Sequence, residues 1–267
     1  MKGQLRNASS SLPKNTVLGT WVQRILFVVV MAAIVLGFCF SAAAQATPPF
    51  PGAQCRDIDP IKLYGGNEWD FQIRREGAPV GTHRLSFHPG RDGVQVIAES
   101  TITISFLGFT AYQFDYRSES LWQQDQLAKL AVTVDDDGDK TTVTARHDAK
   151  TNSLVVTGPD GSETLPATIF PTDHWHCGVL ASQQVLNTIT GHANRVRITN
   201  LGLEKITAGN GGATRIAATH IRYDGELQTD AWYDAEGRWV GLAFKARDGS
   251  SIIYRCLTCT KITGNTQ

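Results

Sequence analysis

The chain has 267 residues with 25 basic and 25 acidic side chains, so its formal net charge is zero. The charges are unevenly placed, because four basic residues and no acidic residue precede Ala46, which leaves an acidic excess in the remainder. Binding to nucleic acid requires a basic face that displaces counterions from phosphates. The composition therefore argues against a nucleic-acid partner, and the length suits one domain with a substantial core.

The first 46 residues have the layout of a secretory signal peptide. A basic, serine-rich lead ends at Arg24, an apolar run covers 25–40, and a cluster of alanines ends at Ala46. We therefore expect export, with the protein periplasmic or secreted. The alternative is that the apolar run stays uncleaved and anchors the chain, which would then be its only contact with a membrane.

Four cysteines follow this segment, at Cys55, Cys177, Cys256 and Cys259. An even number of cysteines in an exported chain predicts disulfide bonds, and all three pairings remain open. The spacing of Cys256 and Cys259 also occurs in redox motifs. Those motifs place the first cysteine at a helix N-terminus, whereas this pair follows a predicted strand, so structural disulfides are the favoured interpretation.

Residues 67–262 read as a single β-rich domain that follows a proline- and glycine-rich linker or arm over 47–66. Alternating apolar and polar residues, as at Trp69, Phe71 and Ile73, are typical of half-buried strands. Turn residues recur along the whole domain, and we predict roughly a dozen strands. A sheet of that size does not stay flat, so we predict a mainly β fold with a large curved antiparallel sheet or incomplete barrel.

One segment, 170–191, departs from this alternation and reads FPTDHWHCGVLASQQVLNTITG. Its apolar residues predict one short helix, over about 178–190, packed on the concave side of the sheet. We expect aromatic and apolar side chains to line that concave surface and to contact an apolar ligand. The predicted ligand-binding residues are Phe106, Tyr112, Phe114, Trp175, Leu186, Trp232 and Phe244.

The same segment concentrates side chains that bind metals, since His174, His176 and Cys177 lie close together in the chain. Two histidines at i and i+2 of an extended segment can supply two zinc ligands. Cys177, Cys256 and Cys259 could complete such a site only if their thiols stayed reduced, and in an exported chain disulfides compete strongly. The alternative is structural: Asp173 caps a helix, Trp175 anchors the segment, and the histidines satisfy backbone groups. We favour the structural interpretation and expect neither a metal nor a cofactor.

Three stretches carry a family resemblance. They read WDFQIRREGAPVGTHRLSF at 69–87, HWHCGVLASQQVLNTITG at 174–191 with GLEKI at 202–206, and AWYDAEGRWVGLAFKARDGSSIIY at 231–254. Over 68–254 the chain resembles a bacterial family of exported proteins classed as a domain of unknown function. This resemblance implies a β-rich envelope protein and no assigned activity. The chain is also distantly similar to periplasmic lipoprotein carriers, whose incomplete barrels hold an acyl chain under a helical lid, although fold does not fix function.

Three functions are consistent with these features. The first is a non-enzymatic exported module that binds a hydrophobic, lipid-like ligand in its curved sheet. The second is a structural or protein-interaction domain of the envelope, with a filled core and another envelope protein as partner. The third is a metal-dependent enzyme that uses His174 and His176. The residues favour the first function over the other two.

Overall fold

The computed structural model describes residues 55–259. The predicted signal peptide and residues 47–54 of the predicted linker lie outside the described residues. No helix in the described part of the chain is long and apolar enough to cross a membrane. The remainder of the predicted linker contains a short helix, α2 (Pro60–Tyr64), which sequence reasoning missed. Asp59 caps its start by accepting from the Lys62 amide, and Gly65 ends it in the left-handed conformation at φ 68°.

Fifteen strands of the described residues form one sheet, which confirms the predicted mainly β fold and exceeds the dozen strands expected. Every neighbouring pair is antiparallel except the short pair β9 and β10. The strands are β1 (Glu68–Arg75), β2 (Ala78–Gly90), β3 (Gly93–Phe106), β4 (Phe109–Gln123), β5 (Gln126–Asp136), β6 (Asp139–Asp148), β7 (Ser153–Gly158), β8 (Gly161–Pro166), β9 (Phe170–Pro171), β10 (Gln184–Leu186), β11 (Ala193–Ala208), β12 (Thr214–Gly225), β13 (Thr229–Tyr233), β14 (Trp239–Lys245) and β15 (Ser251–Cys256).

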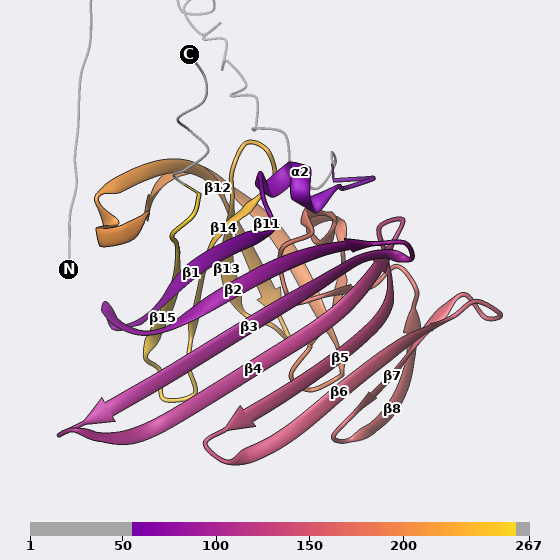
Figure 1. Cartoon of the computed structure of the whole chain (residues 1–267), viewed down its shortest axis with the longest axis horizontal. Helices are drawn as coiled ribbons and strands as arrows, with labels where there is room; N and C mark the ends of the chain where they lie inside the picture. Colours follow the sequence, from indigo (N-terminus) through magenta and orange to yellow (C-terminus); the bar gives the residue numbers. More distant parts are fainter. Residues whose placement is uncertain (1–54, 260–267) are drawn as a thin grey trace, which may run out of the picture. The chain divides into compact units, whose positions relative to one another are not determined.

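The sheet is a single strip that curls until its two edges approach each other. Its order runs from β8 down to β1, then from β15 down to β9. The two edge strands, β8 and β9, are separated in the chain only by 167–169, where the Ile169 amide donates to the Pro166 carbonyl at 3.1 Å. Figure 1 shows the long strands β2 to β6 side by side as one broad curved layer. In the described chain no ladder joins β8 to β9, so the sheet stays open.

Contacts other than strand pairing bring the edges together. Gly158, at the end of β7, lies so close to the turn after β10 that a Cβ there would be 2.5 Å from the Thr190 carbonyl oxygen. In the same region His192 Nε2 lies 3.1 Å from an Asp160 carboxylate oxygen. The sheet is therefore barrel-like in outline, with a seam formed by close packing between β7–β8 and residues 190–192.

The helix predicted over 178–190 is wrong. The structure has a 3-10 helix, η2 (Cys177–Ala181), and then the short strand β10, which pairs with β9 and β11. The apolar residues of this segment do not share one helical face, because Val185 and Leu186 are consecutive and both buried while Ile189 is 43% exposed. A segment enclosed by a sheet is buried on several sides, so its apolar spacing does not reveal a helical period.

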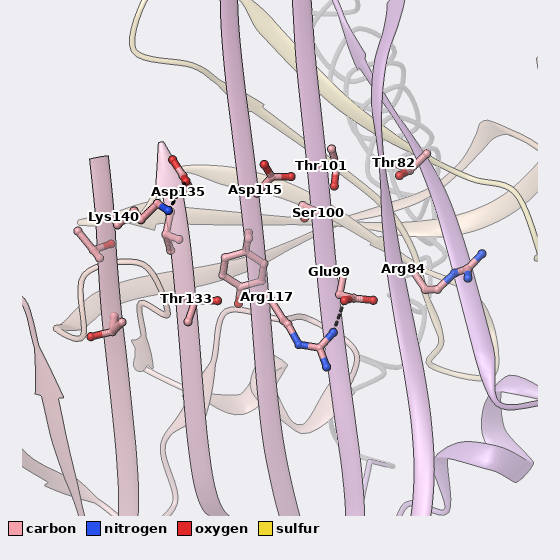
Figure 2. Close-up of a pocket in the computed structure, with 14 residues that line it drawn as sticks. Thr82, Arg84, Glu99, Ser100, Thr101, Asp115, Arg117, Thr133, Asp135 and Lys140 are labelled. Atoms are coloured by element: carbon pink, nitrogen blue, oxygen red, sulfur yellow. Dashed lines mark hydrogen bonds and ion pairs between the residues drawn. The ribbon is translucent and has the colours of Figure 1, made fainter. Parts of the chain in front are cut away.

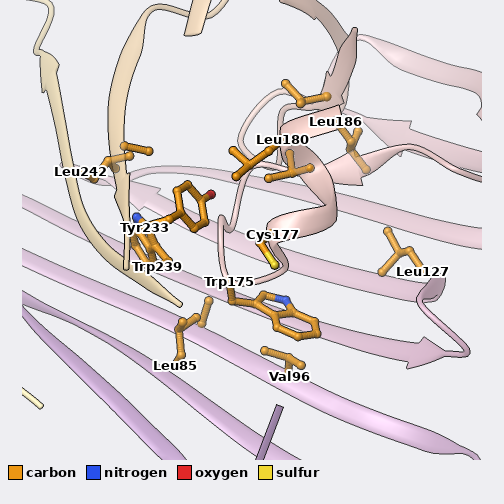
Figure 3. Close-up of a cluster of buried hydrophobic side chains, with 14 of the residues drawn as sticks. Leu85, Val96, Leu127, Trp175, Cys177, Leu180, Leu186, Tyr233, Trp239 and Leu242 are labelled. Carbon is orange, nitrogen blue, oxygen red and sulfur yellow. The ribbon is translucent and has the colours of Figure 1, made fainter. Parts of the chain in front are cut away.

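The core lies inside the curled sheet and surrounds residues 172–182, which we call the plug. Figure 3 shows Trp175, Cys177 and Leu180 of the plug beside Leu85 of β2 and Trp239 of β14. Burial of each such side chain contributes about 1.5–3 kcal/mol to stability. The largest fully buried side chains are Trp69, Trp175, Trp239, Tyr64, Tyr223, Tyr233, Phe71 and Phe87.

Candidate functional site

The plug is fixed by one disulfide and by hydrogen bonds from two buried tyrosines. Cys55 is bonded to Cys177, which ties the segment before α2 to η2, while Cys256 is bonded to Cys259 after β15. The Tyr64 hydroxyl donates to the Trp175 carbonyl at 2.7 Å, and the Tyr233 hydroxyl donates to the His174 carbonyl at 3.0 Å. The Trp175 indole packs edge-on against Trp122, with ring centroids 5.2 Å apart. These contacts hold the plug rigidly against both halves of the sheet.

His176 has a structural environment. The Gly178 amide donates to its Nδ1 at 3.1 Å, and its Nε2 lies 3.2 Å from a carboxylate oxygen of Asp125. Burial lowers the pKa of His176, and the Asp125 carboxylate only partly offsets that effect, so the ring is neutral and donates from Nε2. The Asp125 carboxylate also accepts from the amides of Asp57 and Ile58.

The metal-site alternative therefore lacks a ligand set. Cys177 is in a disulfide, and His176 is engaged through both ring nitrogens. Across residues 55–259, no group of three or more His, Cys, Asp or Glu side chains is arranged to hold a metal ion. Sequence reasoning missed Asp125, which lies 51 positions before His176 in the β4–β5 turn.

The seven predicted ligand-binding residues do not all lie on one surface. Tyr112, Phe114 and Phe244 project from β4 and β14 on the concave side and are half-buried. Trp175 and Leu186 belong to the fully enclosed core. Phe106 is 68% exposed at the tip of the β3–β4 hairpin. Trp232 points to the opposite face of β13 from buried Tyr233, where it stacks on His220 with ring centroids 4.7 Å apart.

Strand register places an apolar surface where β3 and β4 extend past the plug. Ile102 pairs with Phe114 and Ile104 pairs with Tyr112, and alternation puts all four on the concave face. We call these four residues, with Phe244 on β14, the apolar mouth. Each is half-buried, so this surface is incompletely covered. The row containing Ile102 and Phe114 continues across β2, β1, β15 and β14 as Gly81, Ile73, Tyr254 and Leu242.

At the next same-face position along these strands, farther from the tip of the β3–β4 hairpin, the concave side chains become polar. His83 pairs with Ser100, which pairs with Tyr116, and the three side chains lie beneath the row of Ile102 and Phe114. His83 Nδ1 is 2.7 Å from the Ser100 hydroxyl oxygen, and the Tyr116 hydroxyl is 2.9 Å from that of Thr188. His83 and Ser100 are each 5% exposed.

The plug adds His174 to this layer. The centroid of its ring lies 5.5 Å from that of the Trp239 ring, and the centroid of the His83 ring lies 5.3 Å from the Trp239 ring centroid. We call His83, Ser100, Tyr116 and His174 the polar floor. Two of its buried atoms, His83 Nε2 and His174 Nδ1, have no hydrogen-bond partner among the described residues. His174 also has a left-handed backbone at φ 59°, a strained conformation for a residue with a side chain.

Burial sets the protonation of the groups in this layer. It lowers the pKa of His83 to about 3 and that of His174 to about 4, so both imidazoles are neutral at neutral pH. Burial also raises the pKa of Asp173 to about 8, against the smaller opposing effects of its own backbone and of Trp175. The region beneath the apolar mouth is therefore rich in uncharged hydrogen-bonding groups.

The outer face of the same strands has a different character. A groove of about 740 Å³ crosses β2 to β6 there and is lined mostly by polar side chains. Figure 2 shows Arg117 reaching Glu99 across neighbouring strands, and Arg117 also contacts Glu119 at 2.8 Å. Arg84 similarly pairs with Asp70 at 2.7 Å. Exposed pairs of this kind contribute at most about 1 kcal/mol each and leave few free charges for a ligand.

Fold and site together define a barrel-like β module with an enclosed plug and an apolar mouth above a polar floor. The chain belongs to the family described as Domain of unknown function (DUF6134), whose model matches residues 71–257. This confirms the resemblance seen in the sequence. A solved structure described as a beta-barrel-like protein of the domain of unknown function DUF1849 from Brucella abortus is similar, with a TM-score of 0.47 and 11% identity over 71% of this chain and 94% of that chain. No curated protein matches.

Proposed function

We propose that this protein is a non-enzymatic module that binds an amphipathic, lipid-like molecule on the concave face of its sheet. The observation that carries the proposal is the apolar mouth, in which Ile102, Ile104, Tyr112, Phe114 and Phe244 are half-buried beyond the end of the plug. Ligand sites are typically concave and mostly apolar, with a few converging polar groups. The signal-peptide layout of the first 46 residues supports a periplasmic or secreted location for this binding.

The energetic argument is that apolar surface in contact with water is costly. Each square ångström of apolar surface that a ligand covers contributes about 25 cal/mol, before the costs of association. Long strands provide such a surface without rearrangement, because their backbone is already held on both sides by neighbouring strands. The core beneath is filled by the plug, so the acyl part of the ligand would lie along the mouth instead of penetrating the core.

A second candidate function is docking to another protein of the envelope. The observation that favours it is the tip of the β3–β4 hairpin, where Phe106, Leu107 and Phe109 are 68%, 80% and 78% exposed. Exposed apolar clusters mark interaction sites in many proteins. Such a partner would contact the tip and leave the concave face free, so the two functions make different predictions for substitutions at these two places.

A matched pair of substitutions separates the two functions. Phe114→Ser changes the apolar mouth and Phe109→Ser makes the same chemical change at the tip. We expect the chain to bind the apolar fluorescent probe N-phenyl-1-naphthylamine, Phe114→Ser to weaken that binding about tenfold, about 1.4 kcal/mol, and Phe109→Ser to leave it unchanged. Absence of probe binding by the folded wild-type chain would contradict the proposal, as would loss of binding in Phe109→Ser alone.

A further inference from the structure

We infer that the polar floor binds the head of the ligand and selects an uncharged head, such as a hydroxyl, ester or amide group, over a phosphate or carboxylate. This inference rests on the proposed function and adds a ligand class and an orientation to it. It starts from two buried ring nitrogens, His83 Nε2 and His174 Nδ1, that have no partner among the described residues. A buried polar atom without a partner costs about 1–3 kcal/mol, so a group that can bond to it is favoured there.

His83 is oriented by its neighbours. The Ser100 hydroxyl lies 2.7 Å from Nδ1, while Phe71 and Tyr254 pack against the ring with centroids 5.7 and 5.4 Å away. These contacts fix the ring plane and leave Nε2 as the nitrogen that can bond to a ligand. When Nδ1 donates to Ser100, Nε2 accepts, and a ligand hydroxyl or amide N–H is its natural donor.

His174 reaches the same layer from the plug. Its backbone carbonyl is held by the Tyr233 hydroxyl, and its ring lies between Trp239 and Tyr223, each with a centroid 5.5 Å away. Two imidazoles from different elements thus flank Trp239, and both retain an unused nitrogen.

The preference for an uncharged head follows from the groups around this layer. The polar floor and the row above it, from Leu242 through Tyr254, Ile73, Gly81 and Ile102 to Phe114, contain no lysine or arginine. The next member of that row is the Asp136 carboxylate of β5, which accepts from the Tyr112 hydroxyl at 2.7 Å and already pairs with Arg247 at 3.1 Å. A phosphate or carboxylate placed here would lose its hydration without gaining a cationic partner, which costs several kcal/mol. Burial keeps both imidazoles neutral, so they cannot serve as that partner.

The orientation follows from the order of the layers. The apolar mouth is the outer layer and the polar floor is the inner one, one register step deeper on the same strands. Gly81 stands in the intervening row between Ile73 and Ile102, and it packs against the β3 backbone so closely that an added Cβ would lie 2.0 Å from the Thr101 carbonyl oxygen. The head therefore enters first, and the apolar part of the ligand lies along Ile104, Tyr112 and Phe114 toward the hairpin tip.

The test compares three ligands with the same lauroyl chain and different heads. These are monolauroylglycerol, laurate and lauroyl lysophosphatidate, each used to displace the naphthylamine probe from the chain recovered from exporting cells at neutral pH. We expect monolauroylglycerol to bind at least tenfold more tightly than either charged ligand. Failure of the probe itself to bind would overturn the proposed function. If the probe binds but the three lauroyl ligands displace it with equal affinity, this inference is overturned and the proposed function still stands.

Substitutions in the polar floor provide a second test of this inference. We expect His83→Leu to lower the affinity for monolauroylglycerol about tenfold while the affinity for the probe, which has no such head, stays within twofold. If His83→Leu does not fold, Ser100→Ala replaces it in the test, because it removes the contact that orients His83. We expect Ser100→Ala to lower the affinity for monolauroylglycerol by a smaller factor. The matched control is His88→Leu, at an exposed position on β2. Wild-type affinity for monolauroylglycerol in both floor variants would overturn the inference and leave water as the partner of these nitrogens.

Discussion

At the scale of single residues, the buried ionisable groups of the plug and floor make stability depend on pH. Burial lowers the pKa of His83 to about 3 and that of His174 to about 4 from an ordinary 6.5. Below pH 6.5 the unfolded chain therefore takes up protons that the folded chain does not, and the free energy of unfolding falls as pH drops. Burial raises the pKa of Asp173 from 3.8 to about 8, so its contribution has the opposite sign and is lost as pH rises toward 8.

These signs predict a maximum in stability near pH 6.5, with a decline of about 1.4 kcal/mol per pH unit on the alkaline side from Asp173 alone. We expect Asp173→Asn to flatten that alkaline decline, because asparagine has no proton to lose, and to steepen the acid limb between about pH 4 and pH 6.5, where ionisation of Asp173 in the unfolded chain opposes the effect of the two histidines. Chemical denaturation at a series of pH values measures both limbs. Asp139→Asn, at the exposed first residue of β6, is the control. An alkaline limb of unchanged slope in Asp173→Asn would contradict the assignment.

The residues that hold the plug show how far sequence reasoning reaches at this scale. That Trp175 is an anchor follows from its type and its place in an apolar segment. Its partners do not, because Tyr64 contacts the Trp175 carbonyl from 111 positions away, and Asp125 contacts His176 from 51 positions away. A tyrosine in a proline-rich stretch and an aspartate in a turn are ordinary residues until the fold brings them to the plug. Long-range hydrogen bonds of this kind have no local sequence signal.

At the scale of elements, strands were predictable and the plug was not. Alternation in β1, for example at Trp69, Phe71 and Ile73, reflects a sheet with one face in the core, and period 2 survives wherever the other face meets water. Residues 173–180 of the plug are all buried, and so are Val185 and Leu186 of β10, whereas Ala181 and Gln184 are exposed, so burial in this segment follows no regular period. The helix prediction failed because these residues of the plug and β10 are buried by the surrounding sheet whichever way they point. The spacing of the buried residues therefore carries no information on backbone geometry.

The two disulfides act on the plug and on the end of β15, and they should differ in their effect on stability. Cys55 and Cys177 are 122 positions apart, whereas Cys256 and Cys259 are 3 apart. Loop-closure entropy grows with the length of chain enclosed, which gives about 5 kcal/mol for the first and about 2 kcal/mol for the second. We expect the double variant Cys55→Ala/Cys177→Ala to lose correspondingly more free energy of unfolding than Cys256→Ala/Cys259→Ala, measured in urea. Equal losses would show that loop length does not set the difference.

At the scale of the whole molecule, most of the strand order follows from a simple rule. Strands β1 to β8, and β11 to β15, each pair with their neighbours in the chain, as consecutive antiparallel strands usually do. The step that joins the two runs is the pairing of β1 with β15, for example Phe71 with Cys256. Hairpin signals in the sequence identify only pairs of strands that are consecutive in the chain, so they do not predict that β1 pairs with β15. That pairing depends on the curl of the sheet, which brings the first and last strands of the chain together.

The seam between the sheet edges is the part of this architecture most open to a direct test. A Cβ at Gly158 would lie 2.5 Å from the Thr190 carbonyl oxygen and 3.2 Å from the Cα of Gly191, all backbone atoms that cannot rotate away. Gly158→Ala must therefore push β7 and β8 away from residues 190–192. Overpacking of this kind costs about 1–3 kcal/mol.

We expect Gly158→Ala to lower the free energy of unfolding by that amount and to speed amide hydrogen exchange in β7, β8 and β10, while exchange in β1 to β4 stays unchanged. The matched control is Gly66→Ala, where an added Cβ meets nothing within 4 Å and the backbone is not left-handed. If exchange rose uniformly over all strands, the seam would be an integral part of one cooperative sheet. A local rise confined to the edges would establish that close packing at the seam, and not a hydrogen-bonded ladder, holds the curled sheet together.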